Sequence, residues 1–317
     1  MSNGTEQSPE TAFSSKSRYA TIERNNAESF LFHEHPPLEV IHSLHSIGNS
    51  RELGAVATRT LLAGNMSPLN EYGPVHLTPE GRVHDARRNV AAFLHQNNID
   101  QKQIRLLAPE RDYTTPLTII NLDTISLEQD DAQLLRPATK GDFMYTHNAE
   151  LALAVRPADC PVAFVSAETP KGEVSALIHF AWLGVAHGYV TQAKEALNSL
   201  EVNWESLRVR LSAGAHAKSY RYTNYPEDPR EKFPISDGLF VDITQGKEDT
   251  TYNFAIDVAA AAYEEVLKHW DITPYQLFMD TSDTAAPEVG YSSHSRTHQH
   301  YPVDGENSRD LVVARRP

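Results

Sequence analysis

Three short apolar runs in the middle of the sequence constrain the fold more than any other feature. They cover residues 151–155, 162–165 and 174–178, and turn-forming or polar residues separate them. Apolar runs of this length between turn signals are typical of strands that are buried on both faces. Three such runs in succession, joined by short connections, indicate strands that follow one another within a sheet.

Helical and strand patterns flank the three central runs. Apolar residues at helical spacing predict helices over 82–96, 190–200 and 258–270. Alternating or β-rich runs predict strands over 38–45, 105–107, 118–122, 207–211 and 275–279. Because strands and helices alternate only in places, we expect an α/β fold, a layered sandwich of mixed β-sheets flanked by helices.

The domain organisation follows from composition along the chain. Residues 1–26 are rich in Ser, Thr, Asn and Glu without an apolar period, which predicts a disordered tail. Residues 27–317 contain no internal repeat and no clear linker, so we expect a single domain. The segment between about residues 123 and 141 is predicted to be an acidic surface loop.

Charge and composition exclude several classes of function. The formal net charge of −14 argues against nucleic acid as a partner, because binding phosphates requires a basic face. No apolar run approaches the length of a bilayer-spanning segment, and the first residues lack a signal-peptide pattern. Cys160 is the only cysteine, so we expect no internal disulfide and a cytoplasmic location.

Two residues stand out as candidates for chemistry. Cys160 lies in the turn 157–161 between two predicted strands, and His179 ends the next strand. Consecutive strands bring these turns together, so a thiol and an imidazole can share one pocket. Such a pair suits zinc, which takes sulfur and nitrogen ligands together, and equally suits a thiolate nucleophile with a histidine base. Asp159 is a candidate partner for His179 or a turn cap.

The sequence segments around Cys160 and His179 resemble those of a known family. The segment 158–161 followed by His179-x-x-Trp182-x-Gly184 resembles the A-D-C-x-P and H-A-G-W-R-G motifs of the laccase-domain family. Further segments match that family's motifs in order: 142–146 its D-x-x-x-T, 213–222 its G-P-x-I…Y, 254–257 its aspartate before a helix, and 291–296 its Y-S-x-R-R. The matching order extends from about residue 40 to residue 315.

The resemblance implies a function. Family members hold zinc with one cysteine and two histidines, cleave purine nucleosides with phosphate, and deaminate adenosine. It therefore implies a zinc-dependent purine nucleoside phosphorylase that is a monomer or homodimer, with a purine nucleoside and phosphate as its partners. Cys160 and His179 would be metal ligands, and Trp182, Tyr222 and Arg296 would lie on the substrate side.

The sequence departs from the family at two chemically important positions. Glu110 stands where the Q-V-H-G motif has the remaining histidine ligand, so the implied site is Cys160, His179 and Glu110. A carboxylate oxygen can bind zinc, although it should make a zinc-bound water less acidic. Leu183 replaces the arginine of W-R-G, which removes a cation that could bind phosphate.

Other interpretations remain open. One is a metal-free thiol hydrolase or deamidase using Cys160 and His179, and another is a non-catalytic relative. His147 and His187 are candidate replacements for the missing ligand, whereas surface positions are expected for His294, His298, His300 and the acidic segment 128–131. True laccase activity is not expected, because copper oxidases need several histidine-rich sites.

Overall fold

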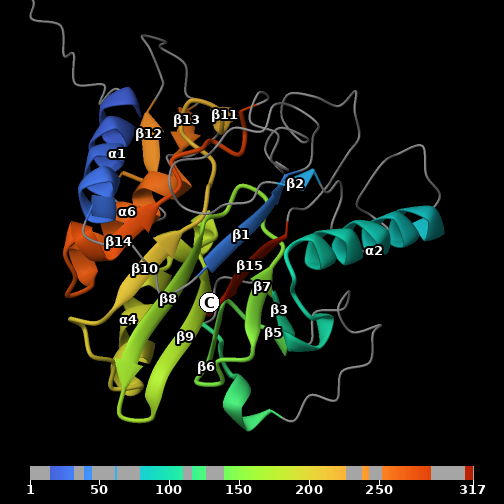
Figure 1. Ribbon diagram of the computed structural model, residues 1–317. Coiled ribbons are helices and arrows are strands. Elements are labelled where there is room, and N and C mark those ends of the chain that lie inside the picture. The colour runs from blue at the N-terminus through green and yellow to red at the C-terminus, as the bar shows by residue number, and fades with distance from the viewer. Residues whose placement is uncertain are drawn as a thin grey trace, which may run out of the picture.

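The framework of the protein consists of two six-stranded mixed sheets (Figure 1). The computed structural model describes residues 15–31, 39–44, 61–62, 79–109, 116–125, 139–225, 238–242, 252–286 and 311–316. The two sheets stack with an apolar layer between them, and helices cover their outer faces. The expected α/β sandwich of mixed sheets flanked by helices is therefore confirmed.

One sheet, which we call the hairpin sheet, is built around two long strands. Its order is β14 (Leu277–Met279), β10 (Arg208–Leu211), β8 (Val162–Thr169), β9 (Gly172–His179), β6 (Phe143–Thr146) and β4 (Ile119–Asn121). β8 and β9 form an antiparallel hairpin in continuous register from the pair Val162–His179 to the pair Thr169–Gly172. Gly172 closes the turn with φ +107°, a backbone conformation that favours glycine.

The other sheet, which we call the outer sheet, combines strands from both ends of the chain. Its order is β2 (Leu61–Leu62), β1 (Glu39–Leu44), β15 (Val312–Arg315), β7 (Ala152–Val155), β3 (Ile104–Ala108) and β5 (Thr139–Lys140). Leu153 and Val155 pack with Phe164 and Leu177 of the hairpin sheet in one buried cluster. This cluster forms the layer between the sheets.

Helices complete the layers. α3 (Trp182–Ala186), α4 (Tyr189–Ser199) and α6 (Val258–His269) pack in the large cluster on the other face of the hairpin sheet. α2 (Pro79–Gln96) packs on the outer sheet through Val90, Phe93 and Leu94. A small sheet of β11 (Arg221–Tyr225), β13 (Tyr252–Ile256) and β12 (Phe240–Asp242) adjoins α6, and 3-10 turns occupy Gln101–Gln103, Leu122–Thr124 and Pro274–Gln276. In Figure 1, α6 lies at the left of the molecule and α2 at the right.

The prediction of a disordered tail over residues 1–26 is wrong for its second half. Residues from Ser15 onward form α1 (Ser15–Leu31), whose side chains Tyr19, Ile22 and Asn26 are buried. Arg18 adds a two-point contact with Glu264 of α6 at 2.8 and 2.6 Å. The helix is held by polar contacts with residues more than 200 positions away, which a search for an apolar period does not detect.

The predicted central elements agree with the structure, while some shorter strands were not predicted. The three apolar runs correspond to β7, β8 and β9, and the three predicted helices to α2, α4 and α6. β6, β15, α3 and the small sheet had no counterpart among the predicted elements. Most of the predicted acidic loop, residues 126–138, lies outside the described residues. None of the helices in the described part of the chain has the length and apolar content needed to cross a bilayer.

Candidate functional site

The open end of the β8–β9 hairpin brings Cys160 and His179 together. Val162, at the start of β8, pairs with His179, at the end of β9, and Pro161 O accepts a 2.9 Å hydrogen bond from Phe180 N. The backbone register thus holds the Cys160 turn beside the end of β9, where Cys160 acts electrostatically on the His179 side chain. The two segments that carry the thiol and the imidazole are adjacent, as the order of the strands predicts.

Asp142 completes this arrangement from the neighbouring strand. It immediately precedes β6, and its Oδ1 lies 2.8 Å from Nδ1 of His179, while its carbonyl accepts a 2.8 Å bond from the His179 amide. Both side chains are buried. Asp142 lies in the segment that matches D-x-x-x-T, but the sequence alone assigns it no role, because the pairing of β6 with β9 is not visible in local sequence. The useful signal was the aspartate that opens D-x-x-x-T.

The electrostatics of His179 follow from its two partners. Burial alone would lower the pKa of the imidazole. The hydrogen bond that the Asp142 carboxylate accepts and the electrostatic effects of Asp142 and Cys160 outweigh burial, and they raise the pKa of His179 to about 10. The ring thus holds a proton firmly when no metal competes for it. With Nδ1 engaged by Asp142, Nε2 is the ring nitrogen left for Cys160 or for a metal ion.

Of the two roles considered for Asp159, the structure shows the turn role and not the contact with His179. The carboxylate that contacts His179 Nδ1 is Asp142, whereas Asp159 Oδ1 accepts a 3.0 Å hydrogen bond from Thr284 Oγ1. Asp159 has φ 69°, an uncommon conformation for a residue other than glycine. Its carbonyl also accepts a 2.8 Å bond from Ala215 N. Asp159 therefore fixes the turn that presents Cys160.

Trp182, one of the two aromatic residues predicted on the substrate side, packs against the small sheet. Trp182 begins α3 and meets Phe240 edge-on with ring centroids 5.9 Å apart, and Phe240 meets Phe254 at 5.6 Å. Tyr222 of β11 pairs through its backbone with Phe254 of β13, although its side chain lies outside the described residues. Arg296 also lies outside them.

The described residues fit part of a zinc site. Cys160 and His179 are suitable ligands, and a carboxylate on the other nitrogen of a ligating histidine is a common supporting contact. Within the part of the chain that the structure describes, no three His, Cys, Asp or Glu side chains converge as a metal-binding group. Glu110, the implied remaining ligand, lies outside that part, as do His294, His298, His300 and residues 128–131.

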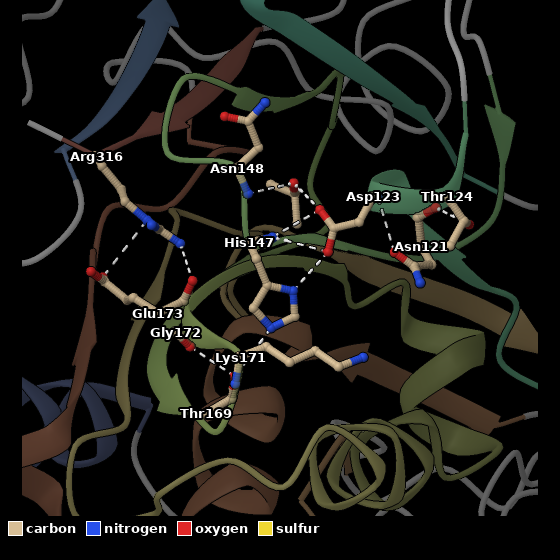
Figure 2. Close-up of polar contacts among 11 residues, drawn as sticks. Asn121, Asp123, Thr124, His147, Asn148, Thr169, Lys171, Gly172, Glu173 and Arg316 are labelled. Carbon is tan, nitrogen blue, oxygen red and sulfur yellow. Dashed lines mark hydrogen bonds and ion pairs between the residues drawn. The ribbon is translucent and has the colours of Figure 1, made fainter.

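A second histidine–aspartate pair lies at the closed end of the same hairpin (Figure 2). His147 Nδ1 is 2.7 Å from Asp123 Oδ2, and its Nε2 is 3.1 Å from Thr169 Oγ1 at the end of β8. At about 3.3 Å per residue, the length of β8 separates this pair from His179 by about 23 Å. His147 is therefore too distant to replace the missing ligand. His187 follows α3 as its C-terminal cap.

Comparisons with known proteins agree with this architecture. The family model described as "Multi-copper polyphenol oxidoreductase laccase" matches residues 80–303. No curated protein matches the sequence.

Three similar solved structures have little sequence identity to this chain. YlmD from Geobacillus stearothermophilus is 17% identical with a TM-score of 0.61 over 87% of this chain and 90% of that chain. The hypothetical protein YfiH from Bacillus licheniformis is 15% identical with a TM-score of 0.55, covering 74% of this chain and 82% of that chain. NMB0706 from Neisseria meningitidis is 18% identical with a TM-score of 0.52, covering 74% and 81%. At these identities the likeness establishes the fold alone.

Proposed function

Since this chain belongs to the family of multi-copper polyphenol oxidoreductase laccases, we propose that it cleaves purine nucleosides with phosphate and deaminates adenosine as a second activity. In this proposal Cys160, His179 and Glu110 hold a zinc ion. The observation that carries it is the buried contact of Asp142 with His179, together with the position of the Cys160 turn beside the end of β9. The proposal also depends on the activities that the sequence resemblance implies.

The buried carboxylate supports the metal assignment on physical grounds. Asp142 accepts the Nδ1 proton of His179, so the imidazole is fixed in orientation and its Nε2 is presented to a ligand. Structural contacts of this kind typically strengthen metal binding about 10- to 100-fold. When bound, zinc supplies a Lewis acid that stabilises developing negative charge and lowers the pKa of a water molecule.

The surrounding residues give the site its shape. The turn at Asp159, locked by Thr284 and by Ala215 N, sets the position of Cys160. The edge-on contact with Phe240 holds the indole of Trp182, which follows His179 by three residues in the sequence. An indole is a suitable surface for stacking a planar purine base. Displacing the base with phosphate further requires a cation to orient the anionic nucleophile.

A second candidate is a metal-free thiol hydrolase or deamidase, and the position of the Cys160 turn beside His179 favours it. In this alternative Cys160 Sγ attacks the carbonyl carbon of an amide, and the leaving nitrogen takes a proton from His179. Water then hydrolyses the thioester, releasing the acid and restoring the thiol. Asp142 would hold the imidazole in place, as the third member of such groups does.

Metal content separates these two candidates. We expect about one zinc per chain in tag-free wild-type protein by plasma mass spectrometry, and loss of zinc in Cys160→Ala and Glu110→Ala. His147→Ala is a matched control, because it removes a histidine from a similar aspartate pair at the other end of the hairpin. This control should retain the zinc. A wild-type protein without zinc would contradict the metalloenzyme proposal.

Activity then identifies the reaction. Chromatography measures the release of free purine from inosine or adenosine, and this release should depend on phosphate. The conversion of adenosine to inosine should not depend on phosphate. If zinc is absent and iodoacetamide labels Cys160 rapidly, the thiol hydrolase is favoured. An intact fold with no zinc, no turnover and a slowly labelled thiol would instead indicate a non-catalytic family member.

A further inference from the structure

Arg210 lies on the same face of the hairpin sheet as His179. Val209 and Leu211 belong to the cluster on the helix side, so alternation along β10 directs Arg210 to the opposite face. Arg210 pairs with Phe164, and Phe164 belongs to the cluster between the sheets. His179 pairs with Val162, which belongs to that same cluster. The guanidinium and the imidazole therefore project from one face, in adjacent rows of paired residues.

Among the residues that the structure describes, no acidic side chain forms an ion pair with the guanidinium of Arg210. Its Nη1 is buried without a hydrogen-bond partner in the part of the chain that the structure describes. Burial lowers its pKa to about 10. Across the sheet its neighbours are Phe164 and Phe278, whose ring centroid lies 5.7 Å from the guanidinium carbon. Arg208 and Ser212 precede and follow Arg210 on the same face of the sheet. None of these four neighbouring residues is acidic.

Arg208, two residues away, provides the contrast. Its Nη1 donates hydrogen bonds to the carbonyls of Glu205 and Leu207 at 2.9 and 2.8 Å. The two arginines share a strand and a face, but only Arg210 has a buried guanidinium nitrogen without a partner within the described residues. An aromatic ring compensates only part of the loss of hydration of a buried cation.

We propose that Arg210 is the anchor of an oxyanion-binding site, with phosphate as the ligand class. A bound phosphate would supply the missing counter-charge and accept hydrogen bonds from the guanidinium. The planar guanidinium presents two parallel N–H groups to phosphate oxygens, a geometry that a lysine ammonium does not reproduce. Arg210 would bind phosphate whichever reaction occurs at Cys160.

The position of Arg210 also connects it to catalysis, and this connection rests on the proposed function. The strand spacings place the Cα atoms of Arg210 and His179 about 12 Å apart. The guanidinium lies near the ring of Phe278 on the neighbouring strand β14, so an anion held there would share the sheet face of His179 without contacting its ring. Leu183 stands at the motif position where relatives carry arginine. Arg210 would therefore supply from β10 the cation that is absent after Trp182.

Thermal unfolding of the full chain in phosphate tests the site without any enzymatic assay. At constant ionic strength, with chloride as reference, wild-type Tm should rise saturably, by about 2–4 °C when phosphate is about five times its Kd. Arg210→Met should abolish the rise and should not lower the Tm in chloride, because it removes an uncompensated charge. Arg208→Met should keep the rise. Arg210→Lys retains the charge without the planar donors, and it should weaken phosphate binding about tenfold.

Several outcomes would overturn this proposal. One is a wild-type Tm that does not respond to phosphate; another is an Arg210→Met protein that keeps the full response. Comparing inorganic phosphate, ribose 1-phosphate and AMP identifies the source of the phosphate group by the tightest Kd. Zinc content, measured on the same Arg210→Met protein, should be unchanged, so a failure of the anion site and a failure of the proposed zinc enzyme give different results.

Discussion

The ring of Tyr19 stacks on the ring of His216, with centroids 3.6 Å apart and planes inclined by 12°. Tyr19 comes from α1, and its hydroxyl donates to the buried Asp257 Oδ1 at the start of α6. His216 lies in the segment whose residue Ala215 donates to the Asp159 carbonyl. The N-terminal helix is therefore connected through one stacked pair to the turn that carries Cys160.

The stacked histidine should make the protein sensitive to acid. Burial, and then the charge of Lys218, lower the pKa of His216 to about 3, from 6.5 in the unfolded chain. Because the folded state resists protonation, this contribution to stability is complete above pH 6.5. It is lost as the pH falls from 6.5 towards 3, by about 1.4 kcal/mol per pH unit.

The substitution His216→Phe keeps a flat ring against Tyr19 and removes the titrating group. Urea unfolding at pH 7, 6, 5 and 4 should show a gentler loss of stability in the variant than in the wild type. The pKa values of Asp257 and Asp283 are raised by burial, which gives the opposite slope, but these residues are present in both proteins. Parallel pH profiles of the two proteins would show that His216 is not the sensitive group.

The docking of α1 should depend on Asn26. Its buried amide donates to the carbonyl of Met279 and accepts a 3.2 Å hydrogen bond from the Met279 amide. Asn26→Ala leaves both backbone groups without these contacts, so we expect a loss of about 1–3 kcal/mol in the free energy of unfolding. Arg24→Ala removes only an exposed contact with Glu28 on the same helix and should change stability by less than about 0.5 kcal/mol. Equal losses in both variants would show that α1 is not docked through Asn26.

The two histidine–aspartate pairs allow a matched test of Asp142. Asp142→Asn removes the carboxylate from His179, and zinc affinity and turnover should fall about 10- to 100-fold. Asp123→Asn makes the same change beside His147, where only the closed end of the hairpin is affected. Chelator competition and steady-state rates should therefore distinguish the variants, and equal effects of the two would count against a special role for Asp142.

Gly184 should tolerate no side chain. A Cβ at this position would lie 2.7 Å from Cδ2 of Tyr189, whose ring is fully buried. Gly184→Ala should cost about 1–3 kcal/mol of stability through overpacking and disturb α3 close to His179. Gly188→Ala serves as a comparison, since it has open space at its Cβ but a φ of +79°. Gly188→Ala should lower the stability by about 1–2 kcal/mol because of this backbone conformation. It should leave the zinc content unchanged. Normal stability of Gly184→Ala would contradict this packing argument.

The parts of the fold that local sequence predicts are those whose partners are close in the chain. Phe164, Val165, Leu177 and Ile178 are almost completely buried, so β8 and β9 read as continuous apolar runs. Helix α1 was missed because Tyr19 reaches Asp257, 238 positions away, and polar contacts leave no apolar period. The sequence did not predict β6 as a strand, because it is only four residues long and its pairing with β9 is not visible in local sequence.

The candidate site follows the same rule. Cys160 and His179 belong to one hairpin, so their meeting could be expected from the order of strands. Asp142 joins them from a different strand and Arg210 from another, and their relation to His179 depends on sheet order and on which face each residue occupies. Those two properties are fixed by tertiary packing, which a single sequence does not display.

The register of the β8–β9 hairpin has a consequence for the order of assembly. A hairpin closes in about 1–10 µs, because its contacts are local, whereas contacts between distant segments form later. The thiol and the imidazole are thus expected to meet while the outer sheet and α1 are still undocked. In the folding chain, the Cys160 thiol and the His179 imidazole would then lie side by side and be accessible to metal ions from solution. Loading the site would precede enclosure of the sandwich, and the finished molecule would have no need to reopen for it.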